Sequence, residues 1–179
     1  MNIIKTMSCA VILSFSVISG AAASDLASYE RVFIAPVSID LPERSNRRGG
    51  ERPVSRRDQE RKAADLREKL SDAFDDDFTI VAEPGDGVLT IETVITELKS
   101  TRPTPADLTR EPGLSFESLF VGGAAATFTL SENGAVLDEF SDDDFGNFND
   151  GNIRVGIWQD ADRAFSLMSR RLVRYVKKN

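Results

Sequence analysis

The chain has 179 residues, a net charge of −7, a single cysteine and no histidine. The absence of histidine excludes Ser-His-Asp and Cys-His catalysis, and it excludes zinc, copper or non-haem iron sites built on imidazole. Without histidine, the remaining possibilities are carboxylate chemistry, lysine chemistry, an oxygen-ligated hard cation, or no chemistry at all. The negative net charge disfavours nucleic-acid binding.

Residues 1–23 have the pattern of a secretory signal peptide. Lys5 precedes a mostly apolar run over residues 6–19, and Ala21 and Ala23 fit the A-x-A pattern of a signal-peptidase site. The apolar run is shorter than the ~20 residues that span a bilayer. We therefore expect cleavage after Ala23, with an uncleaved N-terminal anchor as the alternative.

Cys9 lies inside this leader and precedes its apolar run, so it does not form a lipobox. The mature chain then has no cysteine for a disulfide or a thiolate site. The sequence predicts an exported, periplasmic protein with no transmembrane span in the mature chain and one domain over residues 24–179. Peripheral association with the outer membrane is left open.

The first half of the domain reads as strand, helix, strand, strand. Residues 31–39 form a nearly continuous apolar run, which predicts a strand buried on both faces with a bulge or an end at Pro36. After a basic polar loop, about 40–57, a helix begins near Ser55, with Ser55 and Asp58 placed as a capping pair. Its apolar stripe, spaced by three and four residues, is Ala63, Leu66, Leu70 and Phe74.

Two strands are predicted next, over residues 78–82 and 88–99, separated by a Pro-Gly turn. The order strand, helix, strand favours a parallel crossover. We interpret residues 100–115 as a proline-containing loop, and residues 115–121 as either a helical turn or an entry strand.

The stretch GGAAATFTLSENGAVLDEF, ending at Phe140, reads as a β-hairpin. Alternation from Ala124 to Leu130 has period two, and Asn133-Gly134 is a favoured hairpin turn. A tight turn pairs Leu130 with Leu137, whereas a shift by one residue pairs Phe128 with Phe140, so the register stays open and a bulge is expected.

Residues 142–152 form a predicted acidic loop, and a final helix covers about 160–176. The order β-α-β-β-β-β-α predicts an α+β fold: a small mixed sheet with two helices packed on one face. The stripe of the last helix is Trp158, Ala161, Phe165, Met168, Leu172 and Tyr175 with Val176.

Three groups of charged residues are candidate sites. A possible anion-binding loop contains six arginines: Arg44, Arg47, Arg48, Arg52, Arg56 and Arg57. Asp142, Asp143 and Asp144, with Asn147, Asn149 and Asp150, could ligate calcium, although the spacing does not match an EF-hand and a solvated loop is the alternative. A carboxylate pair for glycoside hydrolysis is chemically allowed, but no acid stands in an apolar pocket by sequence.

The segments YERVFIAPVSI, AADLREKLSDAF, GDGVLTIETVITEL, the hairpin and WQDADRAF resemble the bacterial exported family called domain of unknown function 3313. The resemblance extends from Tyr29 to about Tyr175. It implies an envelope protein similar to the family's lipoproteins, and it carries over no catalytic residues. This sequence departs from the family's lipoproteins because it has no usable lipobox, which puts attachment to the membrane by a lipid in question.

We therefore expect a non-enzymatic periplasmic protein with no cofactor and no metal. It would bind another envelope component, either an unidentified envelope protein or an anionic envelope surface, with a sheet edge that could accept a partner strand. The alternatives are a carboxylate-dependent hydrolase acting on envelope saccharides and a calcium-dependent module.

Overall fold

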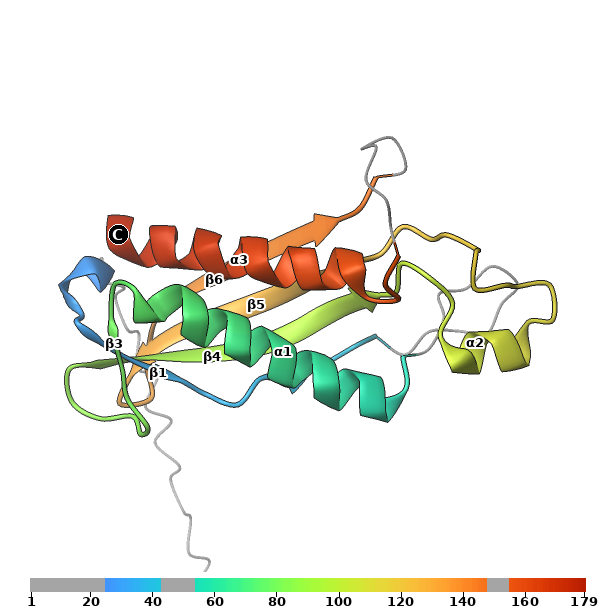
Figure 1. Ribbon diagram of the computed structural model, residues 1–179. Coiled ribbons are helices and arrows are strands. Elements are labelled where there is room, and N and C mark those ends of the chain that lie inside the picture. Colours follow the sequence, from blue (N-terminus) through green and yellow to red (C-terminus); the bar gives the residue numbers. More distant parts are fainter. Residues whose placement is uncertain (1–24, 43–53, 148–154) are drawn as a thin grey trace, which may run out of the picture.

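The structure is a computed structural model that describes residues 25–42, 54–147 and 155–179. The expected signal peptide, the arginines Arg44, Arg47, Arg48 and Arg52, and the residues Asn149 and Asp150 lie outside these ranges. Within them, the chain is an α+β fold with one mixed sheet and two long helices on one of its faces (Figure 1), as the sequence predicts.

The sheet has six strands: β1 (Arg31–Ile34), β2 (Ser38–Ile39), β3 (Thr79–Ile80), β4 (Val88–Lys99), β5 (Gly123–Glu132) and β6 (Ala135–Phe145). The strand order is β3-β1-β4-β5-β6, and β2 pairs with β4 beyond the end of β1. The pairings of β1 with β3 and β4 are parallel, and those of β4, β5 and β6 are antiparallel. Among the described residues, β3 and β6 are the ends of this order, and β2 forms a further short edge because it pairs with β4 alone.

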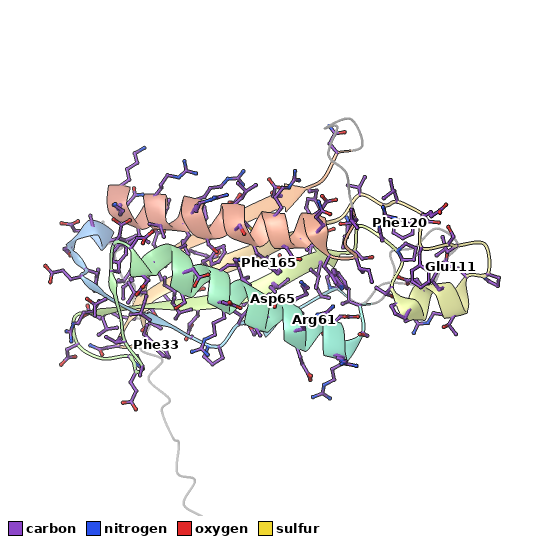
Figure 2. All side chains as sticks on the ribbon, viewed as in Figure 1. Phe33, Arg61, Asp65, Glu111, Phe120 and Phe165 are labelled. Atoms are coloured by element: carbon purple, nitrogen blue, oxygen red, sulfur yellow. The ribbon has the colours of Figure 1, made fainter. Side chains whose placement is uncertain are left out.

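The predicted first strand ends at Pro36, because proline cannot donate the ladder hydrogen bond. It is not buried on both faces, as its apolar run suggested. Val32 and Ile34 are buried beneath the helices, but Phe33 is only half-buried on the other face (Figure 2). The apolar run predicted the wrong burial because none of the described helices packs on that face of the sheet.

Helix α1 (Arg56–Asp75) packs on β1, β2 and β3, and α3 (Gln159–Lys178) packs on β5 and β6. The expected cap of α1 is confirmed: the Asp58 amide donates to Ser55 Oγ over 3.1 Å. Leu66, Leu70 and Phe74 are buried as predicted, whereas Ala63 is half-buried and Lys62 takes its place in the buried stripe.

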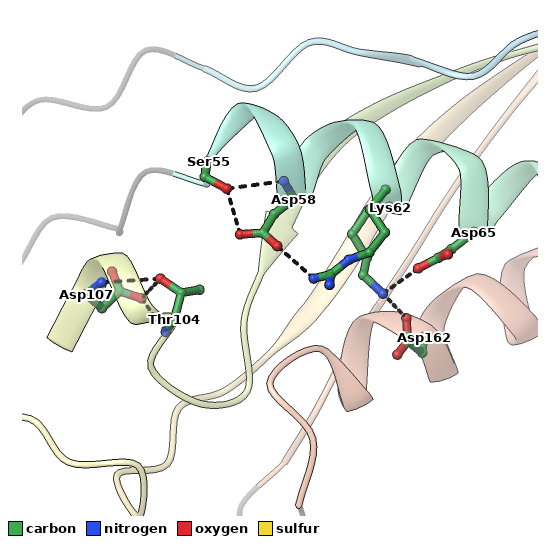
Figure 3. A network of polar contacts seen from close by, with 8 residues as sticks. Ser55, Asp58, Lys62, Asp65, Thr104, Asp107 and Asp162 are labelled. Carbon is green, nitrogen blue, oxygen red and sulfur yellow. Dashed lines mark hydrogen bonds and ion pairs between the residues drawn. The ribbon is translucent and has the colours of Figure 1, made fainter. Parts of the chain in front are cut away.

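The core lies between these helices and the sheet. Its largest members include Phe74, Phe128 and Phe165, which are completely buried. Trp158 also joins the core, with 6% of its surface exposed. Near the N-terminal ends of the helices, Lys62 links α1 to α3 through Asp162 (Figure 3).

The pairing of β5 with β6 shows which of the two hairpin registers is present. Phe128 faces Phe140 and Glu132 faces Ala135, and the register shifts between Leu130 and Ser131. The expected bulge is therefore present. Asn133 and Gly134 have φ angles of 50° and 80°, the left-handed values that a two-residue hairpin turn requires.

Two loop predictions are wrong. Residues 105–110 form a short helix, α2 (Pro105–Arg110), inside the expected loop 100–115. The expected acidic loop from Asp142 is a strand as far as Phe145, because β6 runs the full length of β5. In addition, Leu26–Ser28 forms a 3₁₀ turn, η1, for which no prediction was made.

Candidate functional site

Apolar side chains are exposed at one end of the molecule, beyond the C-terminal end of β4. Among the described residues, five large hydrophobic side chains are exposed, and four of them are Phe116, Leu119, Val121 and Val155. The fifth, Val136, lies at the hairpin turn between β5 and β6. We call the four residues the apolar end.

Thr101 holds the two parts of the apolar end together. Its backbone carbonyl accepts from the Phe120 amide over 2.8 Å, and its own amide donates to the Ile157 carbonyl over 2.7 Å. Its hydroxyl accepts from the Asp160 amide over 3.1 Å, so it caps the first turn of α3. The segments that carry Val121 and Val155 are therefore fixed on either side of one buried threonine.

Gly122 allows this approach. A β-carbon at Gly122 would lie 2.5 Å from Thr101 Oγ1 and 2.8 Å from Thr101 N. A β-carbon at Gly123 would contact the Asp144 carbonyl and the Phe145 ring. The two glycines before the hairpin thus serve backbone packing and do not form a phosphate loop.

Helix α2 supports the segment that carries Phe116 and Leu119. Thr104 caps it, Pro105 begins it, and the Asp107 carboxylate accepts a hydrogen bond of 2.8 Å from the Thr104 amide (Figure 3). The sequence Thr-Pro-x-Asp carried this signal, which could have been recognised. The segment after it, residues 111–122, contains hydrogen-bonded turns. Of the two alternatives for 115–121, a single turn closed by the Ser118 amide on the Ser115 carbonyl is present, and an entry strand is not.

Edge strand β6 is the longest edge of the sheet, and the sequence predicts that a sheet edge could accept a partner strand. No described strand pairs with its outer side, but two of its amides are capped within the chain. Glu139 N donates to Asp138 Oδ1 over 2.8 Å, and Asp143 N donates to Asp142 Oδ1 over 2.9 Å. Acidic side chains that occupy edge amides disfavour strand addition.

Asp142 and Asp144 also attach β6 to α3. Arg171 lies 3.0 Å from Asp142 Oδ1, and Arg163 lies 3.0 Å from Asp144 Oδ1. The Asp138 carboxylate accepts the Tyr175 hydroxyl over 2.5 Å, and this bond, with burial, raises the pKa of Tyr175. These carboxylates bind helix side chains, and the described residues contain no group of three acidic side chains placed to hold a metal ion.

The arginine-rich site is only partly described. Arg56 and Arg57 occupy the first turn of α1, and Arg56 Nε lies 3.0 Å from Glu60 Oε1 in a highly exposed ion pair. Such a pair contributes little to stability.

A shallow groove of about 450 Å³ lies between α1 and the β1–β3 edge. Arg67 crosses it and donates to the Ile34 carbonyl over 3.3 Å. Its lining mixes both charges with small apolar side chains: Ile34, Ala64, Arg67, Glu68, Ser71, Asp72, Ile80 and Val81. No set of polar groups converges in it.

Within residues 25–42, 54–147 and 155–179, no helix combines the length and the apolar character needed to cross a membrane.

Several solved structures resemble the chain at low sequence identity. A DUF330 protein from Xanthomonas campestris is 10% identical, with 85% of this chain and 88% of that chain covered at a TM-score of 0.50. The PelC dodecamer of Paraburkholderia phytofirmans is 11% identical (83% and 92% covered, TM-score 0.44), and a minor lipoprotein of Acinetobacter baumannii is 11% identical (84% and 94% covered, TM-score 0.41). The likeness to the DUF330 protein concerns the fold alone.

A comparison with curated protein sequences gave no match. The family model described as protein of unknown function (DUF3313) matches residues 20–172, over nearly the whole of the described structure. The chain therefore belongs to the DUF3313 family.

Proposed function

We propose that this protein is a non-enzymatic, exported protein of the cell envelope that docks onto another envelope component through its apolar end. The observation that carries the proposal is the position of Phe116, Leu119, Val121 and Val155 at one end of the molecule. Among the described residues, Val136 is the one other large hydrophobic side chain that is exposed. Clustered exposed apolar side chains mark interaction sites more often than scattered ones do.

The rigidity of the apolar end supports docking by a preformed surface. Thr101 is completely buried and bonds to both flanking segments, and α2 is capped at its start. A surface that is ordered before binding loses less conformational entropy on binding. The leader-like residues 1–23 support the envelope location.

The edge of β6 supports the proposal less well than the apolar end does. Asp138 and Asp142 already occupy two of its amides, so an incoming strand would have to displace them. The ion pairs of Asp142 and Asp144 with α3 likewise give no support to a carboxylate-dependent hydrolase.

Site-specific photocrosslinking in living cells tests the proposal. A photoreactive phenylalanine analogue at position 116 is expected to give adducts in the envelope fraction. The same analogue at position 136 is the matched control, because Val136 and Phe116 are similarly exposed, at 67% and 65%. Equal adduct yields at the two positions, or none at either, would refute docking through the apolar end.

A further inference from the structure

We infer that the groove between α1 and the β1–β3 edge binds an extended peptide segment of a partner protein, and that this segment carries a basic side chain. The groove is separate from the apolar end, so the inference does not depend on the proposed function. Three features of the described residues carry it: a stretch of β1 that β3 leaves uncovered, a backbone amide without an acceptor, and two acidic side chains on α1 without an ion pair.

Strand β3 leaves the second half of β1 uncovered, because it pairs with Arg31 and Val32 and ends there. On this side of β1, the Val32 carbonyl accepts the Val81 amide over 3.0 Å. The side to which the backbone groups point alternates from one residue of a strand to the next. Ile34 therefore points its amide and its carbonyl to the same side as Val32 does, beyond the end of β3.

The backbone of Ile34 is only partly satisfied. Its carbonyl accepts the Arg67 guanidinium over 3.3 and 3.4 Å, which is longer than most hydrogen bonds of this type. Among the described residues, no acceptor bonds to its amide. Ile34 is 4% exposed, and amides that are buried in native proteins nearly always have a partner.

The groove has the shape that strand addition requires. Ile34 lines it together with Ile80 and Val81 on the strand side, and small side chains at Ala64 and Ser71 leave room on the helix side. Its polar side chains do not converge on one point, so recognition would come from the backbone. An extended peptide presents donors and acceptors in turn along its main chain, and it would supply the acceptor that the Ile34 amide lacks.

The charge of the helix wall defines the chemistry of the segment. Glu68 and Asp72 line the groove four residues apart on α1, and both are exposed. Neither has an ion pair within the part of the chain that the structure describes, and like charges at this spacing repel each other. Arg67 is the one cation among the lining residues, and its guanidinium lies against the Ile34 carbonyl.

A lysine or arginine of the bound segment would relieve this repulsion, because complementary charge favours one partner over others. A second copy of this chain fits less well. Each copy has a net charge of −7, and net charge of one sign opposes self-association. The groove therefore favours a basic segment of a different protein.

Peptide selection tests the inference. The protein is purified from producing cells in the form that they process, and short linear peptides of random sequence, displayed on phage, are selected on it. Enriched peptides are then synthesised, and their affinity is measured for the parent and for two variants. E68Q/D72N removes the two carboxylates of the groove. D75N/D76N is the matched control, because Asp75 and Asp76 are exposed at the end of the same helix and do not line the groove.

We expect the enriched peptides to contain lysine or arginine and to bind E68Q/D72N at least fivefold more weakly than the parent. D75N/D76N should bind within twofold of the parent. N-methylation of the peptide amide that pairs with the Ile34 carbonyl should weaken binding at least tenfold. Bound peptide should slow hydrogen exchange of the Ile34 amide at least tenfold, and exchange at Ala35 should not change, because the Ala35 amide already donates to the Ile91 carbonyl.

Failure to enrich any peptide, equal binding to the parent and E68Q/D72N, or unchanged exchange at Ile34 would overturn the inference. An Ile34 amide that is protected without peptide, in a sample that sediments as a dimer, would assign the groove to a second copy and would also overturn it. Crosslinking at position 116 reports on the apolar end and not on this groove, so either proposal can fail while the other stands.

Discussion

Lys62 Nζ of α1 lies 2.5 Å from Asp162 Oδ1 of α3 and 2.6 Å from Asp65 Oδ2 of its own helix. The lysine side chain is 5% exposed, whereas those of Asp65 and Asp162 are 36% and 49% exposed. The ammonium is thus the buried member of the group, and each carboxylate reaches solvent. This asymmetry determines which substitution is harmful.

We expect K62M to change the free energy of unfolding by no more than about 1 kcal/mol, because methionine fills the space and both carboxylates can be solvated. The double variant D65N/D162N leaves the buried ammonium without an anion and should lose about 2–3 kcal/mol. Adding K62M to D65N/D162N should then restore stability. Urea denaturation measures all four proteins, and further destabilisation by K62M in that background would contradict the burial argument.

The glycines before the hairpin provide a second prediction. G122A places a methyl group against Thr101, and G123A places one against Asp144 and Phe145 at a φ angle of +153°. Overpacking of this kind costs about 1–3 kcal/mol, and we expect each variant to lose at least that much by thermal or urea unfolding. G113A is the matched control, because nothing lies within 4 Å of its added β-carbon. A loss in G113A as large as that in G122A would show that close packing is not the reason.

Local patterns in the sequence predicted much of the fold. The capping pair of Ser55 and Asp58, the break at Pro36 and the Asn133-Gly134 turn each depend on neighbouring residues, and the structure confirms all three. Lys62 was missed because its burial depends on Asp162, which lies 100 residues further along the chain. The sequence-based prediction ended the second hairpin strand at Phe140, because the Asp-rich half of β6 has low strand propensity. Pairing with β5 outweighs that propensity, and the strand continues to Phe145.

The candidate site was less accessible to sequence reasoning. Phe116, Leu119 and Val121 lie in a short apolar stretch whose spacing does not separate a helical turn from a strand, so the sequence pattern does not predict which of these side chains are exposed. The Phe120 amide bonds to the Thr101 carbonyl, a contact between separate segments that a local pattern cannot predict. The Asp142–Asp144 run, by contrast, was visible in sequence, but its arginine partners on α3 were not.

Tyr29 predicts a pH dependence at the alkaline end. Burial, together with the hydrogen bond of 2.8 Å to Glu132 Oε2, raises the pKa of Tyr29 to about 12. Because the folded-state pKa is higher than the unfolded value of about 10, this group's stabilisation is complete below pH 10 and is lost as the pH rises towards 12. Y29F should be less stable than the parent by about 1 kcal/mol at pH 8, and the difference should shrink by pH 11.5.

Urea unfolding of the parent and Y29F at several pH values measures this effect, and other titrating groups cancel in the comparison. A stability difference between the two proteins that stays constant from pH 8 to pH 11.5 would contradict the assignment.

The apolar end should contribute to docking and little to stability. Phe116 is 65% exposed and Leu119 is 45% exposed, so F116S/L119S should change the free energy of unfolding by less than about 1 kcal/mol. F165A, which truncates a completely buried core side chain, should lose about 3–5 kcal/mol. Thermal unfolding of both variants separates the two roles, and a large loss in F116S/L119S would place those side chains in the core.

Neighbouring aspartates on β6 should respond differently to the same substitution. Asp142 accepts Arg171 at 3.0 Å and caps the Asp143 amide, whereas the Asp143 side chain is exposed. D142N weakens a charge-assisted bond to a partly exposed arginine, so we expect a loss of about 1 kcal/mol after allowance for solvent screening. D143N should lie within about 0.5 kcal/mol of the parent.

Urea unfolding at low and high salt tests the pair, and the D142N effect should shrink in high salt because the ion pair is partly screened. Equal effects of D142N and D143N would contradict the role of Asp142 in attaching β6 to α3. A melting temperature that rises with added calcium in the parent, and not in D143N, would show that the acidic run acts as a ligand site.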